Sequence, residues 1–204
     1  MDKLLIATNN QGKIEEITRY LSIPNLKIYS YSQWQNENKI KDSIPDPEED
    51  GSTYYDNAVI KAKAAFQWAS IPVLADDSGI ELRFLGGRPG VNTARYAGVG
   101  CSSKDNVNKM LKELLVAEER TAQYISCLVF YDGKELKSFK GVFKGKIAQK
   151  ESGDGGFGYD PIFIPEGYDE TLASLKTQSV LVATHRMMAM EKFKEFYIDA
   201  VKNV

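Results

Sequence analysis

The sequence predicts an α/β protein with a mixed central sheet flanked by helices. Two observations lead to this fold class. In the first half of the chain, short apolar runs typical of buried strands alternate with segments whose apolar residues recur at helical spacing. In the second half, strand-like segments follow one another before a final helix. Because helices and strands alternate early and strands cluster late, a mixed sheet fits better than a purely parallel one.

The first fifty residues predict two strands, a helix and a loop. Residues 4–8 are typical of a strand and residues 12–21 of an amphipathic helix. Residues 27–34 are expected to form a second strand. Residues 36–51 are polar, contain two prolines and carry an acidic cluster, which is typical of a loop.

A helix is expected over residues 55–69, because apolar side chains recur on one of its faces. That face holds Tyr55, Ala58, Val59, Ala62, Phe66 and Ala69. Asn57 and Lys61 share a different face at i, i+4 spacing. We expect the helix to bury the first face and to present the second.

The rest of the chain predicts strands and two further helices. Residues 72–75 form a short buried strand that ends at Asp76. The later elements are a helix at 105–117, strands at 122–130 and 135–143 joined by an Asp132-Gly133 hairpin turn, a loop at 153–160, an extended segment at 161–164, and a helix from the N-cap Thr184 to about residue 201.

Length, charge and cysteine usage exclude several classes of protein. At 204 residues the chain can bury about 70% of its unfolded surface, enough for one core with two lobes or for two small domains. The formal net charge of −2 and the lack of a basic stripe argue against nonspecific nucleic-acid binding. Cys101 and Cys127 are too few for a disulfide framework and lack zinc-site spacing. Without a membrane-length apolar run or a signal-peptide cleavage pattern, we expect a cytoplasmic protein.

Two adjacent carboxylates follow the apolar run at 72–75. Strand carboxyl ends are where open α/β sheets gather ligand sites, so Asp76 and Asp77 are candidate active-site residues. Because successive side chains of a strand point to opposite faces, the two cannot enter one cleft unless a turn has begun. We therefore expect one to act and the other to support it. The alternative is a solvated turn in which an aspartate caps a helix.

The segment 8–13 joins a predicted strand to a predicted helix and ends in Lys13. Unpaired amide N–H groups and the positive end of the helix dipole make such a junction a good anion site. It is not a Walker A loop, because the earlier glycine and the following serine or threonine are missing. A plain helix start with a surface lysine is the alternative.

The acidic segment 46–50 offers oxygen ligands of the kind that Mg²⁺ prefers. This ion usually takes one or two protein carboxylates together with phosphate oxygens and water. Charge runs are more often simply solvated, so the segment becomes a candidate metal site only in combination with the aspartate pair.

Residues 153–158 match the dinucleotide pattern G-x-G-x-x-G, yet they run into Tyr159-Asp160-Pro161 rather than a helix. This excludes a Rossmann turn and hence NAD or FAD binding. Glycines around Phe157 indicate backbone close to a flat ligand with rings for stacking, and a tight hairpin with core aromatics is the alternative. His185, the single histidine, cannot form a metal cluster alone and is interpreted as a ligand-recognition residue.

Seven segments carry a resemblance when they are taken in order. They are Ala7-Thr8-Asn9-Asn10-Gln11-Gly12-Lys13, Asn57-Ala58-Val59-Ile60-Lys61-Ala62, Ala75-Asp76-Asp77-Ser78-Gly79, Gly86-Gly87-Arg88-Pro89-Gly90, Ala94-Arg95-Tyr96, Gly156-Phe157-Gly158-Tyr159-Asp160-Pro161 and His185-Arg186. Together they resemble the inosine triphosphate pyrophosphatase family over nearly the whole chain. The resemblance implies a homodimeric α/β enzyme, with one domain over residues 1–204 and two lobes around a nucleotide-binding cleft. It also implies Mg²⁺-dependent hydrolysis of non-standard purine triphosphates (ITP, dITP and XTP) to the monophosphate and pyrophosphate, which removes them from the nucleotide pool.

The resemblance also implies roles for individual residues. Asp77 would bind the metal and accept a proton from the attacking water, with Asp76 in support, and Lys61 would neutralise phosphate charge. Glu48 is the expected second metal ligand, with Glu49 next. The triphosphate would be held by Thr8, Asn9, Asn10, Gln11, Gly12 and Lys13. Substrate and base would be contacted by Ser78, Phe157, Gly158, Tyr159, Asp160, His185 and Arg186.

The sequence departs from the family pattern just before the His185-Arg186 pair. The lysine that is usual five residues before the pair is Val180 here, and the serine directly before it is Thr184. Reduced affinity or altered base selectivity is the resulting hypothesis, and Lys176 is the nearest earlier lysine. Two other functions stay open: a pyrophosphatase for other modified nucleotides, and a catalytically silent nucleotide-binding protein.

Overall fold

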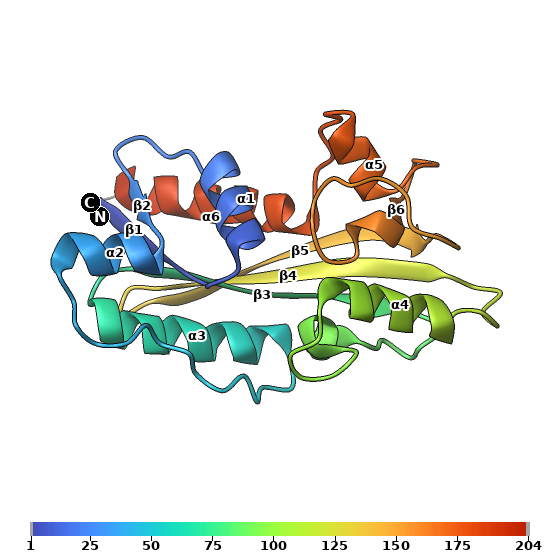
Figure 1. Cartoon of the computed structure of the whole chain (residues 1–204). Helices are drawn as coiled ribbons and strands as arrows, with labels where there is room; N and C mark the ends of the chain where they lie inside the picture. The colour runs from blue at the N-terminus through green and yellow to red at the C-terminus, as the bar shows by residue number, and fades with distance from the viewer. Residues whose placement is uncertain (1, 203–204) are drawn as a thin grey trace. The chain divides into compact units, whose positions relative to one another are not determined.

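The computed structural model describes residues 2–202, and its strands form a six-stranded sheet (Figure 1). The strand order is β2-β1-β3-β4-β5-β6. The chain divides into two compact units. The first holds the described residues of Met1–Asp77, Ser126–Gly141 and Arg186–Val204, and the second holds Ser78–Ile125 and Val142–His185. The predicted α/β class is confirmed, whereas one domain with two lobes around a cleft stays a prediction.

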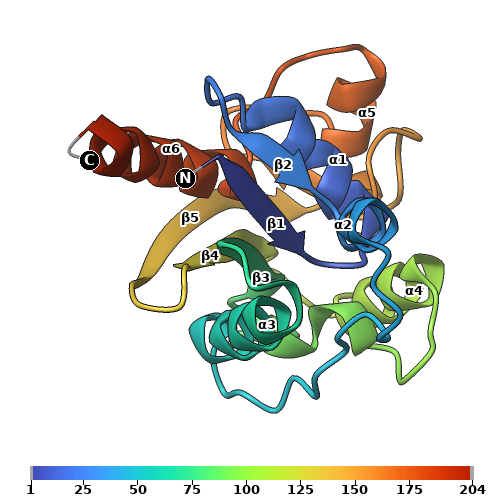
Figure 2. The ribbon, with the colours of Figure 1, turned by 90° about the vertical axis from the view of Figure 1, so that its left-hand side faces the viewer.

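In the first unit, helices cover both faces of the sheet, in which β1, β2 and the start of β3 are parallel (Figure 2). Its elements are β1 (Lys3–Ala7), α1 (Gln11–Tyr20), β2 (Lys27–Tyr29), α2 (Tyr31–Asn38), α3 (Tyr54–Ala69), the start of β3 (Val73–Leu82), the end of β4 (Thr121–Tyr131), the start of β5 (Leu136–Ile147) and most of α6 (His185–Lys202). β1 pairs in parallel with both β2 and β3. Leu5 and Ala7 pack in one core with α2 and α3, whereas Leu4 and Ile6 pack in another with α1 and α6. Because both faces of β1 are buried, its residues after the first are all apolar.

The second unit has its own core. Its elements are the rest of β3, η1 (Gly90–Arg95), α4 (Ser103–Glu113), parts of β4 (Thr121–Tyr131) and β5 (Leu136–Ile147), η2 (Asp160–Ile162), β6 (Phe163–Pro165) and α5 (Leu172–Thr177). β5 pairs antiparallel with β6, with Lys146 opposite Ile164. This pairing makes the sheet mixed, as predicted. Residues of its strands and helices fill the core, among them Met110, Tyr124 and Phe163.

Several predicted elements are present with small shifts at their ends. The hairpin turn between β4 and β5 is confirmed, because Asp132 Oδ1 accepts hydrogen bonds from the amides of Lys134 and Glu135 at 2.9 and 2.7 Å. The last helix begins at His185, directly after the predicted cap Thr184. The glycine-rich pattern at 153–158 is followed by η2 and β6 rather than an α-helix, which agrees with the rejection of a Rossmann turn.

The prediction of a strand over residues 27–34 is wrong beyond Tyr29. β2 ends there, and α2 begins two residues later. Ser30 and Gln33 form a reciprocal capping box, in which each side chain accepts a hydrogen bond from the backbone N–H of the other. A capping box satisfies amides that a new helix leaves unpaired, and here it outweighs the strand preference of the aromatic residues that follow.

The prediction that the strand at 72–75 ends at Asp76 is also wrong. β3 continues as one ten-residue strand through Leu82. Asp76 and Asp77 therefore lie within a strand rather than in a turn, and the solvated-turn alternative is excluded. Their charge is accommodated inside the sheet because cations lie on both sides of β3.

The buried face of α3 differs from the predicted one at its start. Asn57 was expected on the outward face but is only 1% exposed, whereas Tyr55 was expected in the core and is 43% exposed. The Asn57 amide can be buried because it forms hydrogen bonds with Gly51 and Asp77. The polar face of this helix therefore faces inward.

The sequence prediction omitted the short helix α5 (Leu172–Thr177), which begins at the N-cap Thr171. It is only six residues long, and its N-terminal half is entirely buried, so no amphipathic pattern marks it. Among the helices of residues 2–202, none is long and apolar enough to cross a membrane.

Candidate active site

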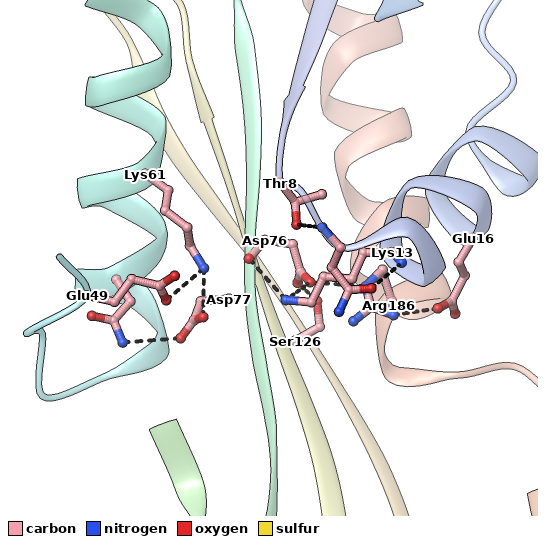
Figure 3. A network of polar contacts seen from close by, with 11 residues as sticks. Thr8, Lys13, Glu16, Glu49, Lys61, Asp76, Asp77, Ser126 and Arg186 are labelled. Atoms are coloured by element: carbon pink, nitrogen blue, oxygen red, sulfur yellow. Dashed lines mark hydrogen bonds and ion pairs between the residues drawn. The ribbon is translucent and has the colours of Figure 1, made fainter. Parts of the chain in front are cut away.

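β3 carries the two adjacent aspartates on opposite faces of one strand (Figure 3). Asp76 faces Lys13 of α1 and Arg186 of α6, and Asp77 faces Lys61 of α3. An extended strand has a side-chain period of two, so neighbours necessarily point apart. The predicted divergence of the two carboxylates is confirmed.

Asp77 is bound by two side chains from one face of α3. The Lys61 ammonium donates to Asp77 Oδ1 at 2.8 Å, and Asn57 Nδ2 donates to Oδ2 at 3.4 Å. The two α3 residues lie one helical turn apart, which places both side chains beside the strand. A capping box between Thr53 and Asp56 fixes the start of this helix. Local helix signals thus set the position of Lys61.

The acidic loop reaches the same cluster through Glu49. Its carboxylate accepts a hydrogen bond from the Lys61 ammonium at 3.0 Å, so one cation holds two carboxylates from distant segments. The loop is tied to α3 at Gly51, whose N–H donates to Asn57 Oδ1 at 2.8 Å. A Cβ at Gly51 would lie 2.6 Å from that oxygen, so only glycine fits.

Burial and charge set the protonation of this cluster. Burial raises the pKa of Asp77 above its ordinary value, and the Lys61 ammonium offsets the rise only in part. Burial lowers the pKa of Lys61, but Asp77 and Glu49 raise it to a value above the ordinary one. The result is a permanently charged lysine beside a carboxylate that is basic for an aspartate. A proton acceptor needs this higher basicity.

Asp76 is the centre of a second, fully buried network. Its Oδ2 contacts Lys13 Nζ at 2.9 Å and Arg186 Nε at 3.1 Å, and its Oδ1 accepts from Ser126 Oγ at 2.7 Å. Arg186 also pairs with Glu16 of α1. The network joins β3, β4, α1 and α6 within the first unit (Figure 3).

The cations around Asp76 hold it in the charged state. Burial by itself raises the pKa of this carboxyl group, but Arg186 and Lys13 outweigh burial and hold the pKa well below the ordinary range. Burial lowers the pKa of Lys13, and Asp76 opposes that shift. Asp76 is therefore a fixed counter-ion that positions Lys13 and Arg186, and it is unsuited to accept a proton.

The segment 8–13 forms the turn that leads into α1. Thr8 Oγ1 accepts a hydrogen bond from the amide of Asn10 at 3.2 Å, and Asn10 Oδ1 accepts from the amide of Lys13 at 3.1 Å. Asn10 is thereby the N-cap of α1, which begins at Gln11. Asn9, Asn10 and Gln11 are exposed, so the positive end of the helix is accessible to an anion.

In the second unit, the glycine-rich loop is organised around Asp160. The carboxylate accepts hydrogen bonds from the amide of Phe157 at 3.0 Å and from Lys176 at 2.8 Å. The Phe157 ring is 39% exposed, whereas Tyr159 is buried and donates its hydroxyl to the carbonyl of Thr93 at 2.9 Å. One aromatic ring of this loop is thus available for stacking, and the other belongs to the core.

The structure places the remaining predicted residues differently. Glu48 is exposed, while its neighbour Glu49 joins the Lys61 cluster. His185 stacks on Tyr124 with ring centroids 4.8 Å apart. Arg186, predicted for base recognition, has its guanidinium in the buried Asp76 network instead. Ser78 is half-buried and Gly158 lies in a turn with φ of 65°.

Four residues of these networks were missed as site residues: Asn57, Ser126, Glu16 and Lys176. The i, i+4 relation of Asn57 to Lys61 was a usable signal. No local pattern marks Ser126 or Glu16 as a site residue, because Ser126 pairs with Asp76 and Glu16 pairs with Arg186, and both partners are distant in sequence.

Comparison with known proteins places the chain in a family. Residues 4–196 match the Ham1 family. The chain belongs to that family. Among its relatives, the dITP/XTP pyrophosphatase of Oceanobacillus iheyensis is 37% identical over 199 residues, which cover 96% of this chain and 98% of that protein. The dITP/XTP pyrophosphatase of Bdellovibrio bacteriovorus is 41% identical, covering 95% and 96%.

Solved Ham1 structures share the fold along the whole chain. The Staphylococcus aureus Ham1 protein superposes with a TM-score of 0.82 at 36% identity and covers 97% of this chain and 99% of that one. A HAM1 protein from Coxiella burnetii gives a TM-score of 0.84 at 31% identity, covering 98% and 100%. The predicted resemblance is therefore confirmed at the level of family and fold.

Proposed function

We infer that this Ham1 protein is a nucleoside triphosphate hydrolase that acts on dITP and XTP, and on ITP, releasing the monophosphate and pyrophosphate. The observation that carries this function is the Glu49–Lys61–Asp77 cluster, in a chain that matches dITP/XTP pyrophosphatases along nearly its full length. The cluster combines a basic carboxylate, a cation for phosphate oxygens and a second acidic ligand.

The chemistry follows from the position of these groups. Asp77 accepts a proton from a water molecule, and the water oxygen forms a bond to the α-phosphorus. The bond between the α-phosphorus and the bridging oxygen breaks, so that the β- and γ-phosphates leave as pyrophosphate. Lys61 neutralises charge on the phosphates as that bond breaks, and no covalent intermediate with the protein is needed.

The residues fit a magnesium ion. Mg²⁺ uses one or two protein carboxylates, and it would neutralise the phosphates and lower the pKa of the attacking water. Among residues 2–202 no group of three or more acidic, cysteine or histidine side chains gathers as a metal site, and the proposed magnesium site uses two carboxylates. Glu49 and Asp77 already share one cation, the Lys61 ammonium, which supports them as the pair. Glu48, the sequence-based first choice, stays a prediction.

Substrate recognition is assigned to two further segments. The turn from Thr8 to Lys13 at the start of α1 would bind phosphate oxygens, which its exposed amides and helix end support. In the second unit, Phe157 would stack on the base, and Asp160 and His185 would line its edge. Ser78 as a substrate contact, a homodimer and a cytoplasmic location stay predictions from the sequence.

Product analysis tests the function directly. The protein is incubated with Mg²⁺ and, separately, with ITP, dITP, XTP, the four standard deoxynucleotides and modified pyrimidine triphosphates, and the products are separated. Monophosphate and pyrophosphate from the hypoxanthine and xanthine nucleotides are expected. Diphosphate with orthophosphate would contradict the reaction, preferred cleavage of a modified pyrimidine would favour the other nucleotide class, and no cleavage would favour a silent binding protein.

A further inference from the structure

Lys176 of α5 lies next to the exposed ring of Phe157, and nothing in the proposed chemistry uses it. Its ammonium is 5.7 Å from the centre of that ring and 2.8 Å from Asp160 Oδ2. The Lys176 side chain is 30% exposed, whereas that of Asp160 is only 7% exposed. A partly solvated cation therefore lies over part of an aromatic ring that is 39% exposed. All three residues belong to the second unit.

The position of this cation is fixed by the loop. Asp160 Oδ2 also accepts the amide of Phe157 at 3.0 Å, so one carboxylate oxygen aligns both the backbone that carries the ring and the ammonium. Gly156 has φ of 81°, and a Cβ there would lie 2.0 Å from the same oxygen. A Cβ at Gly155 would come within 2.9 Å of Lys176 Cβ. The two glycines thus let the loop pack closely against α5.

The ammonium retains donor capacity after binding Asp160. It carries three N–H groups, accepts nothing, and gives one hydrogen bond to the carboxylate. A ligand that stacks on the face of Phe157 where the ammonium lies would bring the edge of its own ring toward these N–H groups. An oxygen at that edge would accept a charge-assisted hydrogen bond from the ammonium. An amino group there could not, because it is itself a hydrogen-bond donor.

We propose that Lys176 is a specificity-determining residue that selects purines with an oxygen at position 6. This inference rests on the proposed function, because it takes the base of the nucleotide as the group that stacks on Phe157. Hypoxanthine and xanthine both carry the 6-oxo acceptor, whereas adenine carries a 6-amino donor. Asp160 acts as a positioning residue that holds the ammonium over the Phe157 ring, beside the stacked base.

Steady-state kinetics on paired substrates test the proposal. ITP and ATP are compared for the wild type and for Lys176→Met, Lys176→Arg and the control Lys112→Met, in which an exposed lysine of α4 is changed. We expect Lys176→Met to lower kcat/KM for ITP by about 10- to 100-fold, mainly through KM, and to leave kcat/KM for ATP nearly unchanged. Lys176→Arg, which keeps the charge, should retain most of the preference, and Lys112→Met should retain all of it.

Equal losses on both substrates would overturn the proposal, because they would indicate a purely structural role for Lys176. An unchanged kcat/KM for ITP in Lys176→Met would overturn it as well. Binding of inosine and adenosine monophosphates, measured by calorimetry, gives a second readout that does not require turnover, and the same loss of preference is expected. If the wild type itself fails to cleave ITP, the proposed function fails. If it cleaves ITP and Lys176→Met keeps the preference, only this inference fails.

Discussion

Asp76 and Asp77 are consecutive residues of one strand, yet they have opposite electrostatic properties. Burial raises the pKa of both carboxyl groups. Asp76 is contacted by the two cations Lys13 and Arg186, and its pKa falls well below the ordinary range. Asp77 is contacted by the single cation Lys61, and its pKa stays raised. The comparison shows that the neighbouring charges, rather than depth of burial, distinguish a fixed counter-ion from a candidate base, because Asp77 has one cation in contact and the carboxylate of Glu49 nearby.

The first way to break this comparison is to remove the charge of Asp76. Asp76→Asn leaves Lys13 and Arg186 buried without their counter-ion, and we expect a loss of about 3–5 kcal/mol in the free energy of unfolding. Urea unfolding measures it. The exposed Asp154→Asn is the matched control and should change stability by less than about 0.5 kcal/mol. Similar losses in the two variants would show that the buried network does not depend on this charge.

Removing the charge of Asp77 should affect turnover rather than folding. We expect Asp77→Asn to reduce kcat by about 100-fold or more, because a proton acceptor is lost, while nucleotide binding is retained. Pyrophosphate release and inosine monophosphate binding are measured side by side, with Asp154→Asn again as control. Near-normal turnover would assign the proton transfer to a different residue.

A smaller effect is expected from the residue that joins Asp77 to the acidic loop. Asn57→Ala removes the donor to Asp77 and the acceptor for the Gly51 amide. Since such supporting contacts orient metal ligands, the Mg²⁺ concentration for half-maximal rate should rise by about 10-fold or more. Rates are titrated against Mg²⁺, and Asn108→Ala, at an exposed position of α4, serves as control. If the Mg²⁺ concentration for half-maximal rate is unchanged in Asn57→Ala, Asn57 has no role in metal binding.

The smallest expected effect concerns pH. The contributions of Asp76 and Asp77 to the free energy of unfolding should depend on pH in opposite directions. The lowered pKa of Asp76 means that its stabilisation is complete above the unfolded value of 3.8 and is lost as pH falls through the folded value. The raised pKa of Asp77 means that its contribution is complete below 3.8 and is lost as pH rises through the folded value. The free energy of unfolding is measured in metal-free buffer between about pH 2 and pH 6 for the wild type and for each Asn variant. The difference between the wild type and the variant should change with pH in opposite directions for Asp76 and for Asp77. Slopes of the same sign would contradict the assignment.

Where a local pattern was strong, the sequence was a reliable guide to the fold. The run at 4–8 and the Asp132 turn gave β1 and the hairpin, because burial on both faces and an aspartate side chain that caps its own turn are visible in a few neighbouring residues. The strand predicted over 27–34 failed because a capping box at Ser30 competes with it. The prediction that the strand ends after Ala75 failed because charged residues usually mark the end of a buried strand, whereas here distant cations neutralise them.

The sequence was sufficient to predict which residues supply the chemical groups of the candidate site, but not which of these residues contact one another. Lys61 and Asp77 were singled out from the sequence, and the structure joins them. Arg186 was assigned to the base, yet its guanidinium binds Asp76, 110 positions away. Glu49 rather than Glu48 reaches the lysine because the loop is tied at Gly51, a contact that no local pattern reveals.

The sequence alone determined the fold class, the family resemblance and the divergence of two adjacent strand carboxylates, because each follows from local periodicity or from residue order. Only the tertiary structure decided which carboxylate meets two cations and which meets one. That choice depends on α1, α3 and α6, which come from distant parts of the chain and pack on opposite faces of β3. Protonation follows from these long-range neighbours, and so does the division between a structural aspartate and a reactive one.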